Sequence, residues 1–201
     1  NDRQKIYKAI DKADFGNGTA LYDAVDFALN KRLNNIQGRK AIVLFTDGVD
    51  TVSRKGSFYS TTNDAEESET IIFPIYYNTF LDNQRRGGIF GSPIPGIGGR
   101  NTGNGTSAEE YALGKKYLED LAGSTGGRVF QSANTFGGLR RAFEGIAEEL
   151  RRQYNIGYYP EKEGKNGEKR QIKVRIYRPD LIVRARDSYT VGANKNTTSM
   201  K

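Results

Sequence analysis

The chain of 201 residues is long enough to bury a core, and it contains no cysteine and no histidine, which excludes disulfides, thiolate or imidazole metal ligands and histidine bases. Its net charge of +7 comes from 31 Lys and Arg residues scattered among 24 Asp and Glu residues, so no nucleic-acid partner is expected. No apolar run approaches the roughly 20 residues that a membrane helix needs, so no membrane span is expected.

The first half of the chain alternates between helical and strand-like patterns. Residues 2–14 and 19–34 carry apolar side chains at helical spacing, which predicts two helices. Residues 40–46 form a continuous apolar run, typical of a strand that is buried on both faces of a parallel sheet. Residues 71–77 predict a second buried strand, in which Pro74 removes one donor and favours an edge position or a bulge.

The second half begins with a Gly-rich stretch and ends in strand-like segments. Residues 78–105 predict a long exposed loop. A capping box at Thr106 and Glu109 starts the next expected helix, which ends at Gly126, and a short strand and a strongly amphipathic helix (135–152) follow. Three further segments predict an antiparallel meander: Tyr154–Tyr159, Gln171–Tyr177 and Leu181–Ala185.

This order of elements predicts a three-layer α/β fold with a doubly wound, mostly parallel, Rossmann-like sheet. Residues 1–152 would form the main body. Residues 153–189 would add a C-terminal antiparallel β extension to the same sheet, and residues 190–201 lack an apolar pattern, which predicts a disordered tail.

Two short segments should meet at the C-terminal edge of the sheet, where ligands bind in such folds. Residues 18–24 (GTALYDA) lie at a helix start, and residues 46–50 (TDGVD) follow a strand. The hydroxyl of Thr19 and the carboxylate of Asp47 are hard oxygen ligands that suit Mg²⁺ or Mn²⁺. The two segments therefore form a candidate metal site.

Local structure offers simpler roles for the same side chains. Thr19 would serve as an ordinary helix cap, and Asp47 with Gly48 would make a turn at the end of the strand. Asp23 would favour the positive end of the helix dipole instead of binding metal, and Asp50 would support the loop around Asp47.

The two segments resemble two of the three loops that build the metal-ion-dependent adhesion site of von Willebrand factor A domains. The resemblance extends to a bacterial, acidobacterial-type family of such domains. The segments that carry this wider resemblance are Ala41–Asp50, Ile72–Tyr77, Leu150–Tyr154, Tyr158–Pro160, Arg178–Leu181 and Val183–Tyr189.

The resemblance implies that residues 1–152 are part of a von Willebrand factor A domain in which Thr19 and Asp47 bind Mg²⁺, Mn²⁺ or Ca²⁺. It also implies that Gly48, Val49 and Asp50 contact a partner. The third family loop, Asp-x-Ser-x-Ser, occurs nowhere in this sequence, so the metal site is expected to be incomplete. The chain also lacks an initiator Met, and we expect a fragment.

The resemblance implies a binding module that is not an enzyme, located outside the cell or in the periplasm. A partner's acidic side chain would fill the open position on the metal. The exposed sheet edge would pair with another copy or with the missing N-terminal segment. Two alternatives stay open: a Mg²⁺-dependent hydrolase or phosphotransferase that uses Asp47, and a metal-free structural interaction module.

Overall fold

The structure is a computed structural model that describes residues 2–12, 18–77, 107–132 and 136–192. The helices are α1 (Arg3–Asp11), α2 (Leu21–Asp26), its π-helical continuation η1 (Phe27–Leu33), α3 (Phe58–Glu67), α5 (Ala108–Thr125) and α6 (Phe136–Arg151). The strands are β1 (Lys40–Thr46), β2 (Thr70–Tyr76), β3 (Phe130–Gln131), β4 (Lys169–Gln171) and β5 (Ser188–Thr190). The expected loop over 78–105 lies outside the described residues.

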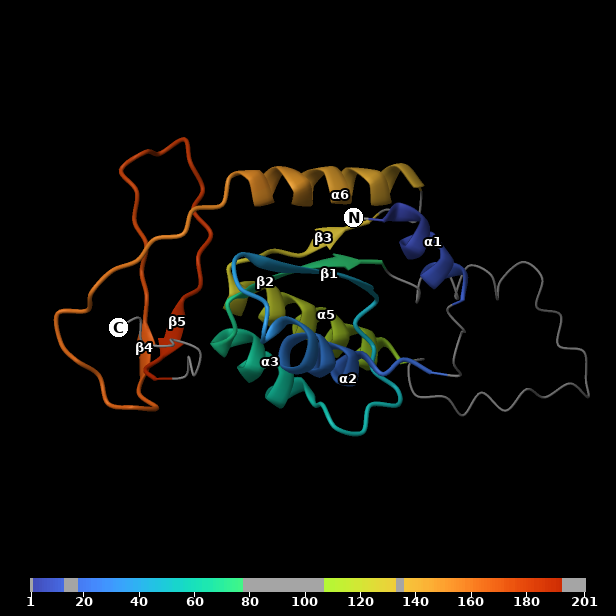
Figure 1. The fold of residues 1–201 in the computed structure, drawn as a ribbon, viewed down its shortest axis with the longest axis horizontal. Coiled ribbons are helices and arrows are strands. Elements are labelled where there is room, and N and C mark those ends of the chain that lie inside the picture. Colours follow the sequence, from blue (N-terminus) through green and yellow to red (C-terminus); the bar gives the residue numbers. More distant parts are fainter. Residues whose placement is uncertain (1, 13–17, 78–106, 133–135, 193–201) are drawn as a thin grey trace, which may run out of the picture.

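A parallel sheet in the order β1-β2-β3 forms the centre of the molecule. Helix α6 lies on one face of this sheet, and α2, α3 and α5 lie on the other (Figure 1). The expected α/β class with a parallel sheet is confirmed, and this arrangement is compatible with a Rossmann-like fold. No helix in the described part of the chain is long and apolar enough to cross a membrane.

Two apolar clusters fill the space between the sheet and its helices. The larger one lies under α2, α3 and α5 and contains Leu21, Val25, Leu29, Ala65, Ile72, Tyr76, Tyr117, Leu118 and Leu121. The smaller one lies under α6 and contains Phe73, Ile75, Phe130, Ala142 and Ile146. Side chains from β2 enter both clusters, because successive side chains of a strand point to opposite faces.

The expectation that Pro74 marks an edge strand or a bulge is wrong. Strand β2 is the central strand, and its register against β1 runs without interruption from Lys40 opposite Thr70 to Thr46 opposite Tyr76. Strand β3 pairs only with Ile75 and Tyr76, so β2 has no ladder partner beside Pro74 on that side. A central strand therefore accommodates a residue that cannot donate.

Helix α5 begins one residue later than the sequence pattern suggested. Its N-cap is Ser107, which exchanges hydrogen bonds with Glu110 in a capping box, and the expected Thr106 lies outside the described residues. The expected end is confirmed, because Gly126 adopts a left-handed conformation (φ 79°) as the C-cap.

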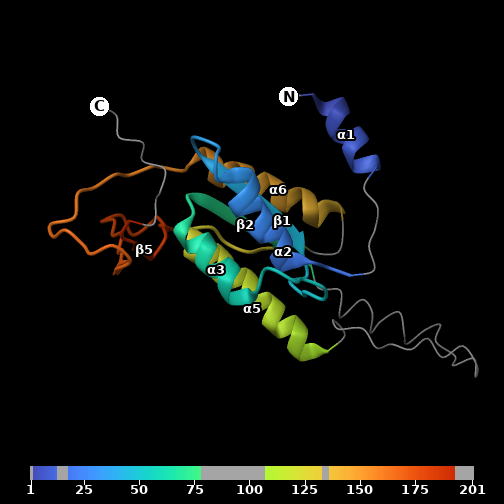
Figure 2. The ribbon, with the colours of Figure 1, turned by 60° about the horizontal axis from the view of Figure 1, so that its bottom comes forward.

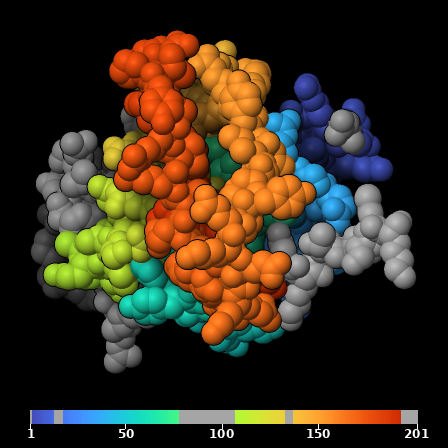
Figure 3. Space-filling view, turned by 90° about the vertical axis from the view of Figure 1, so that its left-hand side faces the viewer, coloured from blue at the N-terminus to red at the C-terminus, as the bar shows by residue number. Residues whose placement is uncertain are grey.

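The C-terminal segment does not extend the main sheet as expected. Strands β4 and β5 form a separate antiparallel pair, and they are the only strands described after α6. Most of Tyr154–Tyr159, Gln171–Tyr177 and Leu181–Ala185 is therefore not strand, and Thr190 of the expected tail belongs to β5. Figure 1 and Figure 3 show this segment, in orange to red, standing at one end of the body, where β5 contacts α3.

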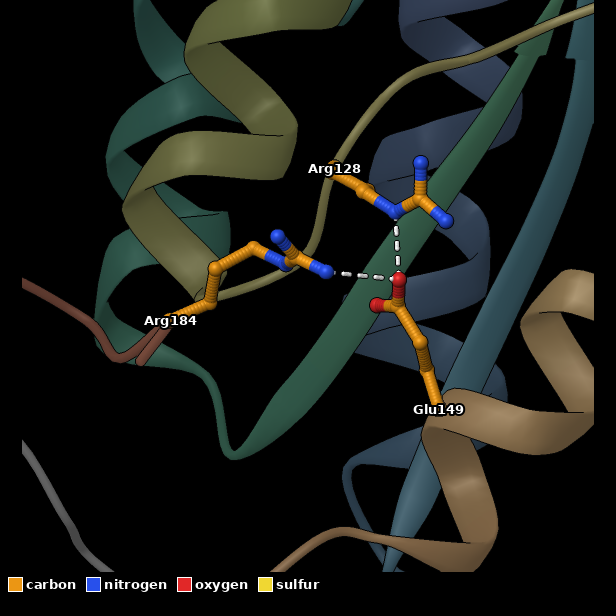
Figure 4. A network of polar contacts seen from close by, with 3 residues as sticks. All are labelled: Arg128, Glu149 and Arg184. Carbon is orange, nitrogen blue, oxygen red and sulfur yellow. Dashed lines mark hydrogen bonds and ion pairs between the residues drawn. The ribbon is translucent and has the colours of Figure 1, made fainter. Parts of the chain in front are cut away.

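Polar contacts attach the C-terminal segment to the body. Glu66 of α3 accepts hydrogen bonds from Lys169 of β4 and Ser188 of β5. Glu149 of α6 accepts hydrogen bonds from Arg128, which precedes β3, and from Arg184 at 2.9 Å (Figure 4). The segment is thus held at two separate elements of the body.

Candidate functional site

Hydrogen bonds join the loop before α2 to the loop after β1, although these loops are about thirty residues apart in sequence. The backbone N–H of Thr19 donates to the Thr51 Oγ1 at 2.7 Å. In return, the carbonyl of Thr19 accepts from the backbone N–H groups of Thr51 and Val52 at 2.8 and 3.2 Å. We call residues 18–23 together with 46–56 the site rim.

Thr19 is not a helix cap. Helix α2 begins at Leu21, and its N-cap is Ala20, whose side chain cannot accept a hydrogen bond. Thr19 is exposed and lies one residue before the cap. The prediction that Thr19 caps the helix is therefore wrong, because its hydroxyl does not cap α2.

Asp47 follows β1 directly and forms the expected turn. The backbone N–H of Val49 donates to the Asp47 Oδ1 at 3.1 Å, and Gly48 adopts a positive φ of 84°. This local bond uses the Oδ1 oxygen of the carboxylate. Burial, and next the negative charge of Asp47, raise the pKa of Tyr76 and Tyr77.

Asp23 lies in the first turn of α2, as expected, and its main contacts join this turn to the loop at residues 54–56. Its carboxylate accepts hydrogen bonds from the backbone N–H groups of three consecutive residues, Arg54, Lys55 and Gly56, at 3.0, 2.8 and 2.7 Å. These bonds, with Gly56 as the largest contributor, lower the pKa of Asp23.

Asp50 supports the loop around Asp47, as expected. Its Oδ1 accepts from the backbone N–H of Tyr22 at 3.1 Å, and its Oδ2 accepts from the backbone N–H of Ser53 at 3.2 Å. The Ser53 hydroxyl also donates to Asp50. The carboxylate therefore ties the loop after β1 to the first turn of α2. Figure 2 shows the backbone of this loop, in cyan, beside the start of α2.

The proposed partner contacts differ in their accessibility. Gly48 and Val49 are buried, and Val49 is only 6% exposed. Thr19, Val52 and Arg54 are exposed on the rim. A partner would therefore meet these three residues before it reached Gly48 or Val49 in this conformation.

Sequence reasoning missed two residues that shape the rim. The Thr51 hydroxyl accepts a hydrogen bond from the backbone N–H of Thr19, and Gly114 of α5 lies against the backbone of Gly48. No local pattern pointed to Thr51, because its partner lies 32 positions away. Gly114 sits inside a helix, where a glycine costs stability and therefore indicates a close packing contact.

Thr19 and Asp47 together would provide only part of the ligand shell of a metal ion. Their hydroxyl and carboxylate oxygens suit Mg²⁺, which takes six oxygen ligands and keeps several waters. Within the described ranges, no group of three or more Asp or Glu side chains gathers at one point. The remaining positions would have to come from water or from groups outside these two loops.

A comparison of the chain with protein-family models, curated proteins and solved structures finds no match. The relation to von Willebrand factor A domains therefore stays a prediction from the motifs quoted above.

Proposed function

We propose that this chain is a divalent-metal-dependent protein-binding module of the adhesion or scaffolding type. The observation that supports this proposal best is the pairing of the Thr19 loop with the Asp47 loop through the hydrogen bonds to Thr51 and Val52. The pairing holds two hard-oxygen side chains on neighbouring loops at the C-terminal edge of a parallel sheet, where such folds bind ligands.

In this proposal, Thr19 and Asp47 hold Mg²⁺ or Mn²⁺, and water occupies the positions that the protein does not fill. An Asp or Glu of a partner protein replaces one of these waters. The exposed side chains of Arg54 and Lys55 favour a partner with acidic residues, because opposite charges speed association and fix its orientation. The family resemblance implies that this binding would occur outside the cell or in the periplasm.

The first test is metal binding by the chain itself. We expect Mn²⁺ to broaden the amide NMR signals of residues 18–20 and 46–49 selectively, since a paramagnetic ion acts only on nearby nuclei. Calorimetry with Mg²⁺ should detect weak binding, because two protein ligands leave most of the shell to water.

Two substitutions make this test specific. Asp47→Ala should abolish both the broadening and the heat of binding, whereas Asp11→Ala, which removes an exposed carboxylate of α1, should leave both unchanged. If wild type and Asp47→Ala respond alike, the metal mechanism fails.

A further inference from the structure

Residues 52–59 lead from the loop after β1 into the first turn of α3, and we call them the entry strip (Figure 2). The backbone of the strip is bound on its inner side. The Val52 N–H donates to the Thr19 carbonyl at 3.2 Å, and the N–H groups of residues 54–56 donate to Asp23 of α2. These bonds fix the path of the strip and use none of its side chains.

The start of α3 fixes the far end of the strip and presents an aromatic ring to solvent. Ser57 and Ser60 exchange hydrogen bonds in a capping box. The Phe58 ring packs against Tyr117 of α5, with ring centroids 5.2 Å apart. The Tyr59 ring lies 5.4 Å from Phe58 but is 84% exposed. A large aromatic side chain is therefore held at a fixed place outside the core.

The other outward side chains of the strip are apolar or cationic. Val52 is 48% exposed, and Arg54 is exposed and forms no ion pair within the described ranges. Arg54 and Lys55 are the only charged residues of the strip. An arginine can bind a carboxylate through two parallel hydrogen bonds, and Tyr and Arg are enriched among the residues that dominate protein interfaces.

We propose that the entry strip binds a segment of a partner protein in which an acidic side chain stands next to an aromatic or aliphatic one. Arg54 takes the carboxylate, and Tyr59 and Val52 pack against the apolar side chain. A nucleic acid would require a longer run of cations, because its affinity comes from many phosphate contacts. The inference rests on the proposed protein partner but adds a contact that needs no metal.

Selection from random peptides displayed on phage tests the chemistry of this partner. The immobilised chain is kept in EDTA, which removes divalent metal. We expect the enriched peptides to carry Asp or Glu next to an aromatic or aliphatic residue. Enrichment of peptides that lack an acidic residue would overturn the proposal, and so would the absence of any enrichment.

Fluorescence polarisation of one enriched peptide then measures the contribution of each side chain. Arg54→Ala and Tyr59→Ala should each weaken binding by about tenfold or more, as substitutions of dominant interface residues do. The matched controls are Arg175→Ala and Tyr154→Ala, which also remove an exposed arginine and an 85% exposed tyrosine. The controls should leave the affinity within about twofold of wild type. Equal losses in the strip variants and the controls would overturn the proposal.

The result is distinguishable from that of the metal test. Mn²⁺ broadening is measured at residues 18–20 and 46–49, whereas peptide binding is measured in EDTA and depends on residues 52–59. Peptide binding that requires Arg54 and Tyr59, without metal binding, would support the entry strip and leave a metal-free interaction module. Metal binding without peptide enrichment would overturn the entry strip and leave the metal site.

Discussion

The backbones of Gly48 and Gly114 lie against each other so closely that neither residue has room for a side chain. A Cβ built on Gly114 would lie 2.6 Å from the carbonyl carbon of Gly48. We expect Gly114→Ala to lower the free energy of unfolding by about 1–3 kcal/mol, because the rim and α5 would have to separate. Urea denaturation measures this change.

Gly123 lies on the same helix and provides the control. A Cβ at this position meets nothing within 4 Å, so Gly123→Ala should raise stability by roughly 0.5–1 kcal/mol through its better helix propensity. Equal effects of the two substitutions would contradict the close contact between α5 and the rim.

A buried hydrogen bond between Thr61 of α3 and Tyr117 of α5 joins the two helices at 2.8 Å. Both side chains are fully buried. Thr61→Val should cost about 1–3 kcal/mol, because it leaves the Tyr117 hydroxyl buried without its partner. Tyr117→Phe should cost less, since the Thr61 hydroxyl still donates to the Ser57 carbonyl at 2.7 Å. Thermal denaturation of the two variants checks the order, and a larger loss for Tyr117→Phe would contradict it.

Glu66 should make stability depend on pH in the acidic range. Burial raises the pKa of its carboxyl, but hydrogen bonds from Lys169 and Ser188 outweigh burial and hold the pKa below its usual value of 4.5. The stabilisation is therefore fully present above about pH 4.5 and is lost as the pH falls through the lower folded value.

Denaturation between pH 7 and pH 3 tests this dependence. Glu66→Gln should destabilise the protein at pH 7, and its difference from wild type should shrink at low pH. Glu67→Gln, at the exposed neighbouring position, should follow wild type throughout. A constant difference between Glu66→Gln and wild type would show that the charge of Glu66 is not responsible.

Glu149 should control the attachment of the C-terminal segment to α6. Glu149→Gln removes the charge that two arginines share, so we expect faster hydrogen exchange in residues 182–187 and a stability loss of about 1 kcal/mol. Glu148→Gln is the matched control, because among the described residues Glu148 forms ion pairs only with Arg151 and Arg152 at the end of its own helix. Unchanged hydrogen exchange in residues 182–187 of Glu149→Gln would contradict the role of Glu149 in attaching this segment.

Elements with a strong local pattern could be predicted from the sequence. Strand β1 and helix α6 lie where their apolar spacing placed them, and α5 ends at the expected Gly126. The position of Pro74 could not be predicted, because it depends on how few residues β3 contributes to the sheet. Of the expected C-terminal meander only one antiparallel pair, β4 with β5, is present, because alternation shows that a segment has two faces but not which strand it joins.

The candidate site was predictable only in outline. Sheet topology brought the Thr19 and Asp47 loops to one edge, and this placement needed no side-chain detail. The hydrogen bond from Thr19 to Thr51 could not be inferred, and neither could the three amides bound by Asp23, because these contacts join residues more than thirty positions apart.

The contacts of Asp23 have a consequence for any ligand of this surface. Three consecutive backbone N–H groups are bound to one carboxylate, and Asp50 fastens the same loop to α2. The conformational entropy of this loop is therefore lost when the chain folds and not when a ligand arrives. A preorganised surface of this kind keeps more of its contact energy as affinity.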